Sequence, residues 1–283
     1  MATGTVIVTG ASTGIGEATA AHLQSLGFSV LAGVRSEADA ERVAAHGLER
    51  MSPLMLDVTD AESIAAAAQT VGQDLGAIGL AGLVNNAGIA VSAPLEFVPI
   101  EDLRMQLEVN VIGQVAVTQA FLPLLRVAQG RIVNMGSIGG RVALPLVGAY
   151  AASKFALEAI TDTLRRELHH QGVEVVVIEP GGIKTPIWEK GNAVADRIAS
   201  NAPPAVEPLY GKLIDAMRLA TARIETDTGL PPVAVAEVVG TALTVPRPRT
   251  RYVVGRDARL RAVAARVLPD RVFDWLVYRA LGL

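Results

Sequence analysis

Cysteine is absent from this sequence, and histidine is scarce. Without cysteine the chain has no disulfides, thiolate metal ligands or cysteine nucleophiles. The histidines, at His22, His46, His169 and His170, have no spacing that resembles a zinc motif. We therefore expect no metal site.

A long apolar segment at the amino terminus and massed charges of one sign are also missing. The first apolar run, residues 5–9, is too short to cross a bilayer, and the amino terminus has no pattern of a secretory signal. The net charge is −3, with Lys and Arg spread along the chain. The spread of the basic residues argues against nucleic acid as a partner. The missing signal pattern favours a cytoplasmic protein.

The last segment departs from this even pattern. Residues 263–283 mix Arg with Leu, Val, Phe and Trp at roughly helical spacing. Such a basic amphipathic helix can lie on a membrane surface or pack on a neighbouring subunit. We favour packing over peripheral membrane contact.

Short apolar runs alternate with helical patterns along the chain. Because these runs are largely apolar, they fit strands that are covered on both faces, as in a parallel sheet with helices on each side. The predicted fold class is α/β, with a doubly wound sheet. The expected strands are residues 5–9, 29–34, 52–56, 81–85, 131–135, 174–179 and 251–254.

No linker or repeat divides the 283 residues, so we expect one domain over residues 1–283. Residues 186–208 predict an irregular, mobile substrate flap, followed by a helix at 209–224. A C-terminal helical extension is expected at about 257–283. We expect the helix that holds Tyr150 to end at Gly172.

A glycine-rich turn runs from Thr9 to Gly16, directly after the first strand and at the start of a helix. Free N–H groups and the positive end of the helix dipole favour a pyrophosphate there, and glycine lets the backbone approach it. The glycines are spaced three then one, in place of the commoner one then two. A plain strand-to-helix turn is the alternative to the nucleotide site that we favour.

The second strand ends at Arg35, with no acidic residue at its tip. An acid there would bond the adenosine ribose, whereas an arginine attracts a 2′-phosphate. NADP is therefore favoured, with NAD possible. If Arg35 is merely solvated or stacks on adenine, either cofactor fits.

Tyr150 and Lys154 lie one helical turn apart, so they share a face. An ammonium beside a phenol favours the phenolate, but lowering a phenol pKa from about 10 to about 7 takes roughly 4 kcal/mol. An exposed ion pair supplies less. Burial and a cationic cofactor must supply the rest if the pair is catalytic. The alternative is a surface helix with its lysine in water.

Ser137 follows the strand at 131–135, at the carboxyl edge of the predicted sheet, where open α/β folds bind ligands. Its hydroxyl can bond a substrate oxygen beside Tyr150, so that two donors hold a carbonyl while it accepts hydride. The alternative is that Ser137 caps a turn.

These motifs together resemble the short-chain dehydrogenase/reductase family, in order and spacing, over residues 5 to about 185. The matching features are the turn from Thr9 to Gly16, the segment Asn85-Asn86-Ala87-Gly88, Asn110, Ser137, the Tyr150 and Lys154 pair, and Pro180-Gly181. The resemblance implies a Rossmann-type oxidoreductase whose catalytic set is Asn110, Ser137, Tyr150 and Lys154. It implies that Tyr150 is general acid in reduction and general base in oxidation. Lys154 would bond the nicotinamide ribose, and Asn110 would hold a water on a proton relay.

The resemblance also implies a cofactor site along the carboxyl edge. Asp57 and Val58 would bracket adenine, although Asp57 is alternatively a helix cap. Asn85 to Gly88 would stabilise the sheet near the adenosine ribose, with a structural turn as the alternative for Asn85. The implied cofactor-binding residues are Gly10, Ser12, Thr13, Gly14, Ile15, Gly16, Arg35, Asp57, Val58, Asn86, Ala87, Gly88, Tyr150, Lys154, Pro180, Gly181, Ile183 and Thr185.

The substrate is expected to be hydrophobic. The loop at residues 138–148 is largely apolar, and the flap supplies Ile187, Trp188, Val194 and Ile198. The long segment after Thr185 and the end of the second strand look more like the branch that acts on steroids and retinoids. By resemblance, a homodimer or homotetramer would form through the helices around Asn110 and Tyr150.

Three other functions compete with this one. A dinucleotide-binding redox sensor or scaffold without turnover commonly loses Tyr or Lys, and this chain keeps both. A 3-oxoacyl thioester reductase would be more compact. A dehydratase or epimerase of the extended branch usually has the one-then-two glycine spacing.

Overall fold

The computed structural model describes residues 3–283 and contains one parallel sheet of seven strands in the order β3-β2-β1-β4-β5-β6-β7. Every pair of neighbouring strands is parallel, so the predicted doubly wound sheet is confirmed. The strands are β1 (Thr5–Val8), β2 (Ser29–Val34), β3 (Met51–Met55), β4 (Gly82–Asn85), β5 (Arg131–Met135), β6 (Glu174–Pro180) and β7 (Arg251–Val254).

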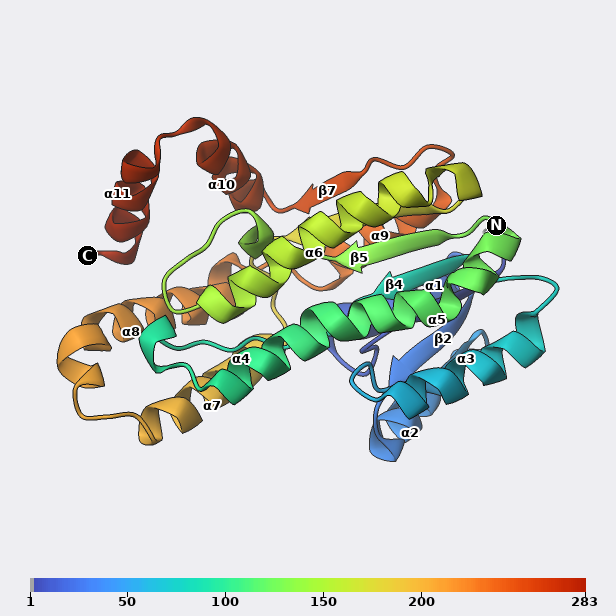
Figure 1. Cartoon of the computed structure of the whole chain (residues 1–283), viewed down its shortest axis with the longest axis horizontal. Helices are drawn as coiled ribbons and strands as arrows, with labels where there is room; N and C mark the ends of the chain where they lie inside the picture. Colours follow the sequence, from blue (N-terminus) through green and yellow to red (C-terminus); the bar gives the residue numbers. More distant parts are fainter. Residues whose placement is uncertain (1–2) are drawn as a thin grey trace.

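Helices cover both faces of this sheet, as Figure 1 shows. On one face, α1 and α9 pack against the strands and against each other. On the other face, α3 and α5 cover the centre, and α6 lies against β6. The helices are α1 (Gly14–Ser25), α2 (Glu37–Ala45), α3 (Ala61–Leu75), α4 (Ile100–Leu107), α5 (Gly113–Ala128), α6 (Gly148–Glu167), α7 (Ile187–Ser200), α8 (Val206–Arg223), α9 (Val233–Thr244), α10 (Arg256–Val267) and α11 (Asp270–Leu281).

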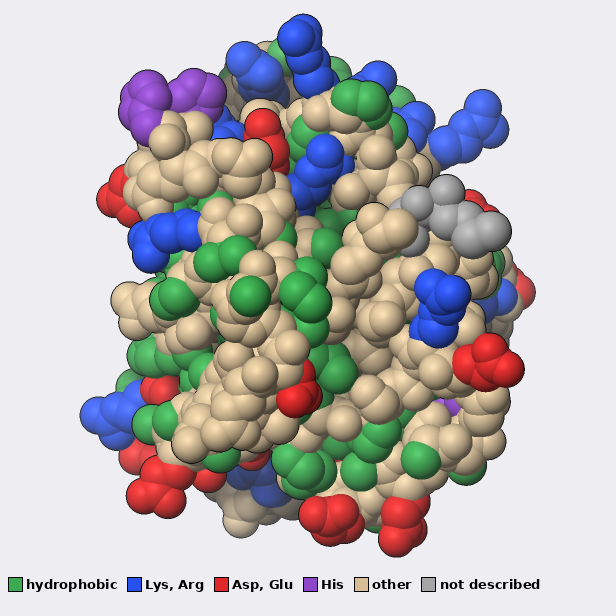
Figure 2. All heavy atoms as spheres, turned by 90° about the vertical axis from the view of Figure 1, so that its right-hand side faces the viewer, with side chains coloured by type: hydrophobic (Ala, Val, Ile, Leu, Met, Phe, Trp, Pro, Cys, Tyr) green, Lys and Arg blue, Asp and Glu red, His purple; other side chains and the backbone are tan. Residues whose placement is uncertain are grey.

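Short helical turns connect these elements. They are the 3-10 turns η1 (Leu95–Phe97), η3 (Ile138–Gly140) and η4 (His169–Gln171), and the π-helical segments η2 (Glu108–Ile112) and η5 (Ile224–Thr228). The arrows of β4, β5 and β7 in Figure 1 point toward the end of the molecule that carries α7 and α8, and the other strands are parallel to them. This end is the carboxyl edge of the sheet. The opposite end, which Figure 2 faces, displays both signs of charge with apolar side chains among them.

The segment expected to be an irregular flap is largely helical, because α7 spans most of residues 186–208. Val194 and Ile198, one turn apart, pack with Val91 and Ala149 in a small apolar cluster. The Trp188 indole donates to the Ile183 carbonyl at 2.6 Å. These contacts fix the helix on the body, so the expectation of irregular structure was wrong. Two of the apolar residues assigned to a substrate wall form this cluster.

Two predicted helix ends also differ from the structure. Helix α6 ends at Glu167 and is followed by the 3-10 turn η4, so Gly172 ends that turn and not the helix. Gly172 has the left-handed conformation, with φ of +73°, that made it a plausible end. Helix α8 begins at Val206, inside the segment expected to be the flap.

Helix α4, η2 and α5 form one continuous helix at residues 100–128 that is long and apolar enough, by length and composition alone, to cross a membrane. Val117, Phe121 and Leu125 of this helix are fully buried in the core under the sheet. A core helix of a globular domain passes the same test, so we assign it to the core.

Candidate active site

The glycine-rich turn between β1 and α1 is packed too closely for side chains. Gly10 and Gly14 have φ of +61° and +63°, which L-residues rarely adopt. A Cβ on Gly16 would lie 2.2 Å from the Gly10 carbonyl oxygen, and one on Gly10 would lie 2.9 Å from the Ala87 Cα. The three glycines therefore allow a tight turn that a larger residue would break.

Thr9 and Asn86 hold this turn in place. The Asn86 side-chain amide donates to the carbonyls of Thr9 and Gly10, at 2.9 and 3.1 Å. The Thr9 hydroxyl accepts from the backbone N–H groups of Asn86 and Ala87, at 2.9 and 3.0 Å. The structure thus brings Asn86 and Ala87, which follow β4, against the glycine turn that follows β1.

The first turn of α1 is open to a ligand. Thr13 occupies the N-cap position, but its side chain makes no capping hydrogen bond, and Ser12 and Ile15 are half-buried. A Cβ on Gly14 would lie 3.4 Å from the Thr185 Cβ, so the chain just before α7 reaches the same place. The arrangement fits a dinucleotide, because free N–H groups at a helix start attract phosphate.

On the predicted adenosine side, Arg35 is exposed to solvent and Asp57 is hydrogen-bonded within the chain. Arg35 is exposed just beyond β2. The Asp57 carboxylate accepts from the backbone N–H and the hydroxyl of Thr59, at 2.9 and 2.7 Å. Asp57 therefore shapes the turn before α3, where Asp60 caps the helix. Val58 is buried beside it, and Gly88 is exposed.

Asn85 crosslinks the centre of the sheet. Its side-chain amide donates to the Thr118 hydroxyl of α5 and to the Asn134 side-chain oxygen of β5, both at 2.9 Å. Asn134 in turn donates to the Thr161 hydroxyl of α6 at 2.8 Å. This buried polar chain ties β4, β5 and two covering helices together directly beneath the carboxyl edge.

Ser137 and Tyr150 meet at this edge. Ser137 caps η3, where its oxygen accepts from the Gly139 backbone N–H at 3.0 Å. A Cβ on Gly139 would lie 3.1 Å from the Tyr150 ring and 3.3 Å from the Ser137 oxygen, which shows how close the three residues are. Burial raises the pKa of Tyr150, and its hydrogen bond with Ser137 acts in the opposite direction. A hydrogen bond that lowers the phenol pKa is one that Ser137 donates, so without substrate the Ser137 hydroxyl hydrogen is directed at Tyr150.

Lys154 is buried one turn along α6 from Tyr150. Its ammonium lies 5.7 Å from the Tyr150 ring centroid and donates to the Met135 carbonyl at 2.7 Å. Burial lowers the pKa of Lys154 to about 8, while the nearby Glu158 opposes that shift. The alternative of a lysine in water is therefore wrong. In this structure the Tyr150 pKa is raised, so the pair by itself does not produce a phenolate.

Asn110 is buried within the π-helical segment η2. Its side-chain oxygen accepts from the Ile89 N–H at 2.9 Å, and its amide donates to the Ile89 carbonyl and the Ser153 hydroxyl, at 3.0 and 3.1 Å. Both amide hydrogens are thus used. The side chain holds the loop after β4 against α6.

Pro180, Gly181 and Ile183 lie where β6 leaves the sheet. Pro180 is the last residue of β6, and the Gly181 N–H donates to the Val254 carbonyl of β7 at 2.9 Å. Ile183 is buried and forms a parallel bridge with Leu230. These contacts fix the turn that leads to Thr185.

Sequence reasoning missed a group of buried charges beneath the site. Glu179, fully buried in β6, pairs with Arg141 at 2.7 Å, and Glu158 of α6 pairs with Arg251 of β7 at 3.1 Å. The signal that could have found Glu179 is an acid at the inner end of a strand whose only other acid, Glu174, stands at its exposed start. For Glu158, the signal is its position one helical turn after Lys154, on the same face of the helix.

The model of the family described as short chain dehydrogenase matches residues 4–195. The chain belongs to the short-chain dehydrogenase family. The resemblance inferred from the motifs is confirmed, and with it an NAD(P)-dependent oxidoreductase that interconverts an alcohol and its carbonyl compound. An NAD(P) cofactor is likewise confirmed as a property of this family.

Several named proteins are similar over nearly the whole chain. The 17-beta-hydroxysteroid dehydrogenase type 6 of Bos taurus is 40% identical, over 97% of this chain and 88% of its own. The NADPH-dependent 3-dehydrocapnine reductase of Ornithobacterium rhinotracheale is 38% identical, over 97% and 96%. Retinol dehydrogenase 7 of Mus musculus is 38% identical, over 96% and 87%. The chain therefore resembles the steroid and retinol dehydrogenase branch.

A solved structure of a short chain dehydrogenase from Burkholderia cenocepacia, in complex with NADP, has the same fold. It is 27% identical, with a TM-score of 0.73, and the match covers 99% of this chain and 98% of that one. The common fold extends beyond the residues that the family model matches, into the C-terminal part of the chain.

Proposed function

We propose that the protein interconverts a hydrophobic alcohol and its ketone or aldehyde with NADP(H) as the preferred cofactor. The observation that carries this proposal is the meeting of Ser137, Tyr150 and Lys154 at the carboxyl edge, beside the closely packed glycine turn. Relatives named for a hydroxysteroid, for 3-dehydrocapnine and for retinol support an apolar substrate.

The cofactor would lie along the carboxyl edge of the sheet, with its phosphates at the first turn of α1. Gly10, Gly14 and Gly16 leave the room, and Ser12, Thr13 and Ile15 line the same turn. Thr185 would close over the phosphates because it lies against Gly14. When bound, the nicotinamide gives or accepts the hydride.

The adenosine half would lie toward β2 and β3. Arg35 is exposed at the end of β2 and would bond a 2′-phosphate, which favours NADP. Asp57 and Val58 would border adenine from the end of β3, with the backbone of Asn86 to Gly88 on the other side. The nicotinamide half would meet Pro180, Gly181 and Ile183.

Tyr150 would transfer the proton. In reduction its hydroxyl donates to the oxygen that forms, and in oxidation its oxygen takes the proton of the alcohol. With substrate bound, the Ser137 hydroxyl hydrogen would turn from Tyr150 to the same substrate oxygen, so that two donors converge on it. Because burial keeps the Tyr150 pKa high in this structure, positive charge brought beside the phenol is needed to form the phenolate.

Lys154 would supply part of that charge and would bond the nicotinamide ribose. The Lys154 ammonium already has one fixed partner, the Met135 carbonyl, and an ammonium has three hydrogens. Two hydrogens therefore remain for the ribose and for water. Since both amide hydrogens of Asn110 are engaged, its side chain cannot donate to a relay water, and we place that water at the backbone of the π-helical segment.

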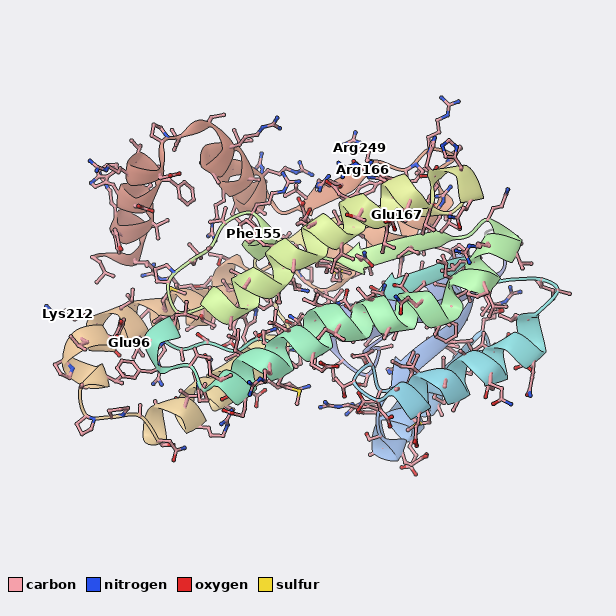
Figure 3. All side chains as sticks on the ribbon, in the orientation of Figure 1. Glu96, Phe155, Arg166, Glu167, Lys212 and Arg249 are labelled. Atoms are coloured by element: carbon pink, nitrogen blue, oxygen red, sulfur yellow. The ribbon has the colours of Figure 1, made fainter. Side chains whose placement is uncertain are left out.

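Assembly as a homodimer or homotetramer is the second part of the proposal. Ile112 is 52% exposed on the long α4–α5 helix, and Phe155 is 45% exposed on α6, where Figure 3 labels it. These apolar groups suit helix packing between copies. The cytoplasm, with no nucleic acid partner, is the location we propose.

The test is a titration with NADPH and with NADH, followed by fluorescence of the bound nicotinamide, and then turnover of apolar ketones and aldehydes. We expect tighter NADPH binding and measurable reduction. Binding without turnover of any carbonyl compound or alcohol would favour a redox sensor. Binding of neither nucleotide would contradict the proposal.

A further inference from the structure

Four charged side chains from four elements meet under the catalytic edge. Arg141 follows η3, Glu158 lies on α6, Glu179 on β6 and Arg251 at the start of β7. Both Arg141 and Arg251 approach the same Glu179 oxygen, at 2.7 and 3.6 Å, and Arg251 bonds Glu158 at 3.1 Å. One guanidinium thus links the two carboxyl groups.

Each of these carboxyl groups has one oxygen without a donor. Oε1 of Glu158 and Oε2 of Glu179 are buried and have no hydrogen-bond donor among residues 3–283. A buried carboxylate oxygen without a donor is costly, and two such anions also repel each other. Arg251 approaches both groups, and Glu179 is within hydrogen-bonding reach of Glu158. One proton on either group therefore makes it a donor to the other and removes the repulsion.

The free oxygen of Glu158 lies against the backbone that carries the catalytic serine. A Cβ on Gly136 would be 3.2 Å from it, and Gly136 stands between Met135, which binds Lys154, and Ser137. Glu179 directly precedes Pro180 and Gly181. The two acids therefore connect both turns that border the proposed nicotinamide site.

We propose that Glu158 and Glu179 are a proton-sharing pair that positions the Ser137 turn and the Pro180 turn and sets the charge beside Lys154. This inference rests on the proposed function for its catalytic consequence. The pair touches neither substrate nor cofactor, so both acids are positioning residues.

The charges around the pair come from every element packed against it. Helix α6 contributes Lys154 and also Asp162, which bonds Arg251 at 2.9 Å and Arg165 at 2.8 Å. Helix α10 contributes Asp257, which lies beside Gly181 and not against the pair. Asp162 is held ionised because Arg251 keeps its pKa low, at about 2.

Loss of the shared proton would change the charge beside Lys154, which lies one helical turn from Glu158. Burial and the repulsion of Glu179 raise the pKa of Glu158 to about 7, against the pull of Arg251. As the pH rises through that value, a negative charge forms near Lys154 and favours its ammonium form. The activity should therefore depend on pH near neutrality through Glu158.

The direct test needs no turnover. Carbon-13 NMR of glutamate side-chain carboxyls, recorded on the full chain without added nucleotide, should show one group titrating near pH 7. That transition should disappear in Glu158→Gln and persist in Glu167→Gln. Glu167 is an exposed acid near the end of the same helix, labelled in Figure 3. If no glutamate of the wild type titrates near neutral pH, the proposal is wrong.

The catalytic test compares pH profiles of kcat/KM. Glutamine at position 158 resembles the protonated acid, so the Glu158→Gln variant should lose the inflection near neutral pH while retaining turnover. Glu179→Gln should remove the same inflection, and serves if Glu158→Gln does not fold. An unchanged profile in both folded variants would overturn the proposal. If a glutamate titrates near pH 7 but the protein has no turnover with any substrate, the proposed function is wrong and the proton-sharing pair is still supported.

Discussion

Helices α6 and α11 treat their side chains in opposite ways, since α6 buries charged groups and α11 exposes apolar ones. Helix α6 buries Lys154 and most of Glu158, and its charges find partners on β5 and β7. Helix α11 buries no residue, and leaves Trp275 55% and Tyr278 50% exposed. Figure 1 shows α11 at the edge of the molecule, whereas α6 lies along the sheet.

The difference shows where each helix finds its partners. A buried charge is retained only where other groups of the chain compensate it, and on α6 they come from elements far apart in sequence. The apolar groups of α11 make few contacts within residues 3–283, where α11 touches mainly α8 and α10. They suit a surface outside this chain.

The largest effect on turnover should come from the Tyr150→Phe change on α6. This change removes the only proton that the proposed mechanism transfers from α6, so turnover should fall by about 100- to 10,000-fold. NADPH should still bind, because the phenol hydroxyl is not at the glycine turn. Steady-state kinetics and fluorescence titration measure the two quantities. Full turnover in a folded variant would rule out Tyr150 as the acid.

Arg35→Glu tests how strongly an exposed charge affects cofactor binding, in contrast to the buried groups of α6. Because the 2′-phosphate would lose a charged hydrogen bond and meet a carboxylate, NADPH affinity should fall by about ten- to a hundredfold. NADH affinity should change little. The matched control is Arg249→Glu, an exposed arginine before β7 that Figure 3 labels. Equal loss for both nucleotides would show that Arg35 does not read the phosphate.

A smaller effect, on stability, is expected from Asp162→Asn on α6. Arg251 and Arg165 hold the Asp162 pKa at about 2, below its usual 3.8. A depressed acid pKa stabilises the fold above the unfolded value, and this contribution is lost as the pH falls toward the folded value. Thermal unfolding should therefore show the wild type more stable above about pH 4, with the gap closing toward pH 2. Asp274→Asn, at an exposed acid on α11, is the control.

The smallest effect on the isolated chain should follow the double change Trp275→Ala and Leu276→Ala. Exposed side chains usually alter unfolding free energy by less than about 0.5 kcal/mol, so Tm and kcat should hardly change. If α11 packs on another copy, as we favour, light scattering should show weaker association. Ile78→Ala, at an exposed apolar site after α3, is the control. A large loss of Tm without a change of mass would contradict the comparison.

The sequence predicted the strands within a residue or two because each is a short apolar run. It also predicted which residues meet at the carboxyl edge, since parallel strands end together. It did not predict helix α7, whose amphipathic pattern was masked by Pro186 and Pro203 at either side. The ion pairs of Glu179 were not predicted, because its partners Arg141 and Arg251 are far away in sequence and approach it only in the folded chain.

The contact between Gly14 and Thr185 bears on the timing of events at the site. It joins the phosphate turn, near the start of the chain, to the residue that precedes α7. A dinucleotide at the first turn of α1 would also touch Thr185 and so add a contact at the start of α7, which packs with Val91 and Ala149. Cofactor would then bind before substrate and leave after product, which is an ordered kinetic sequence.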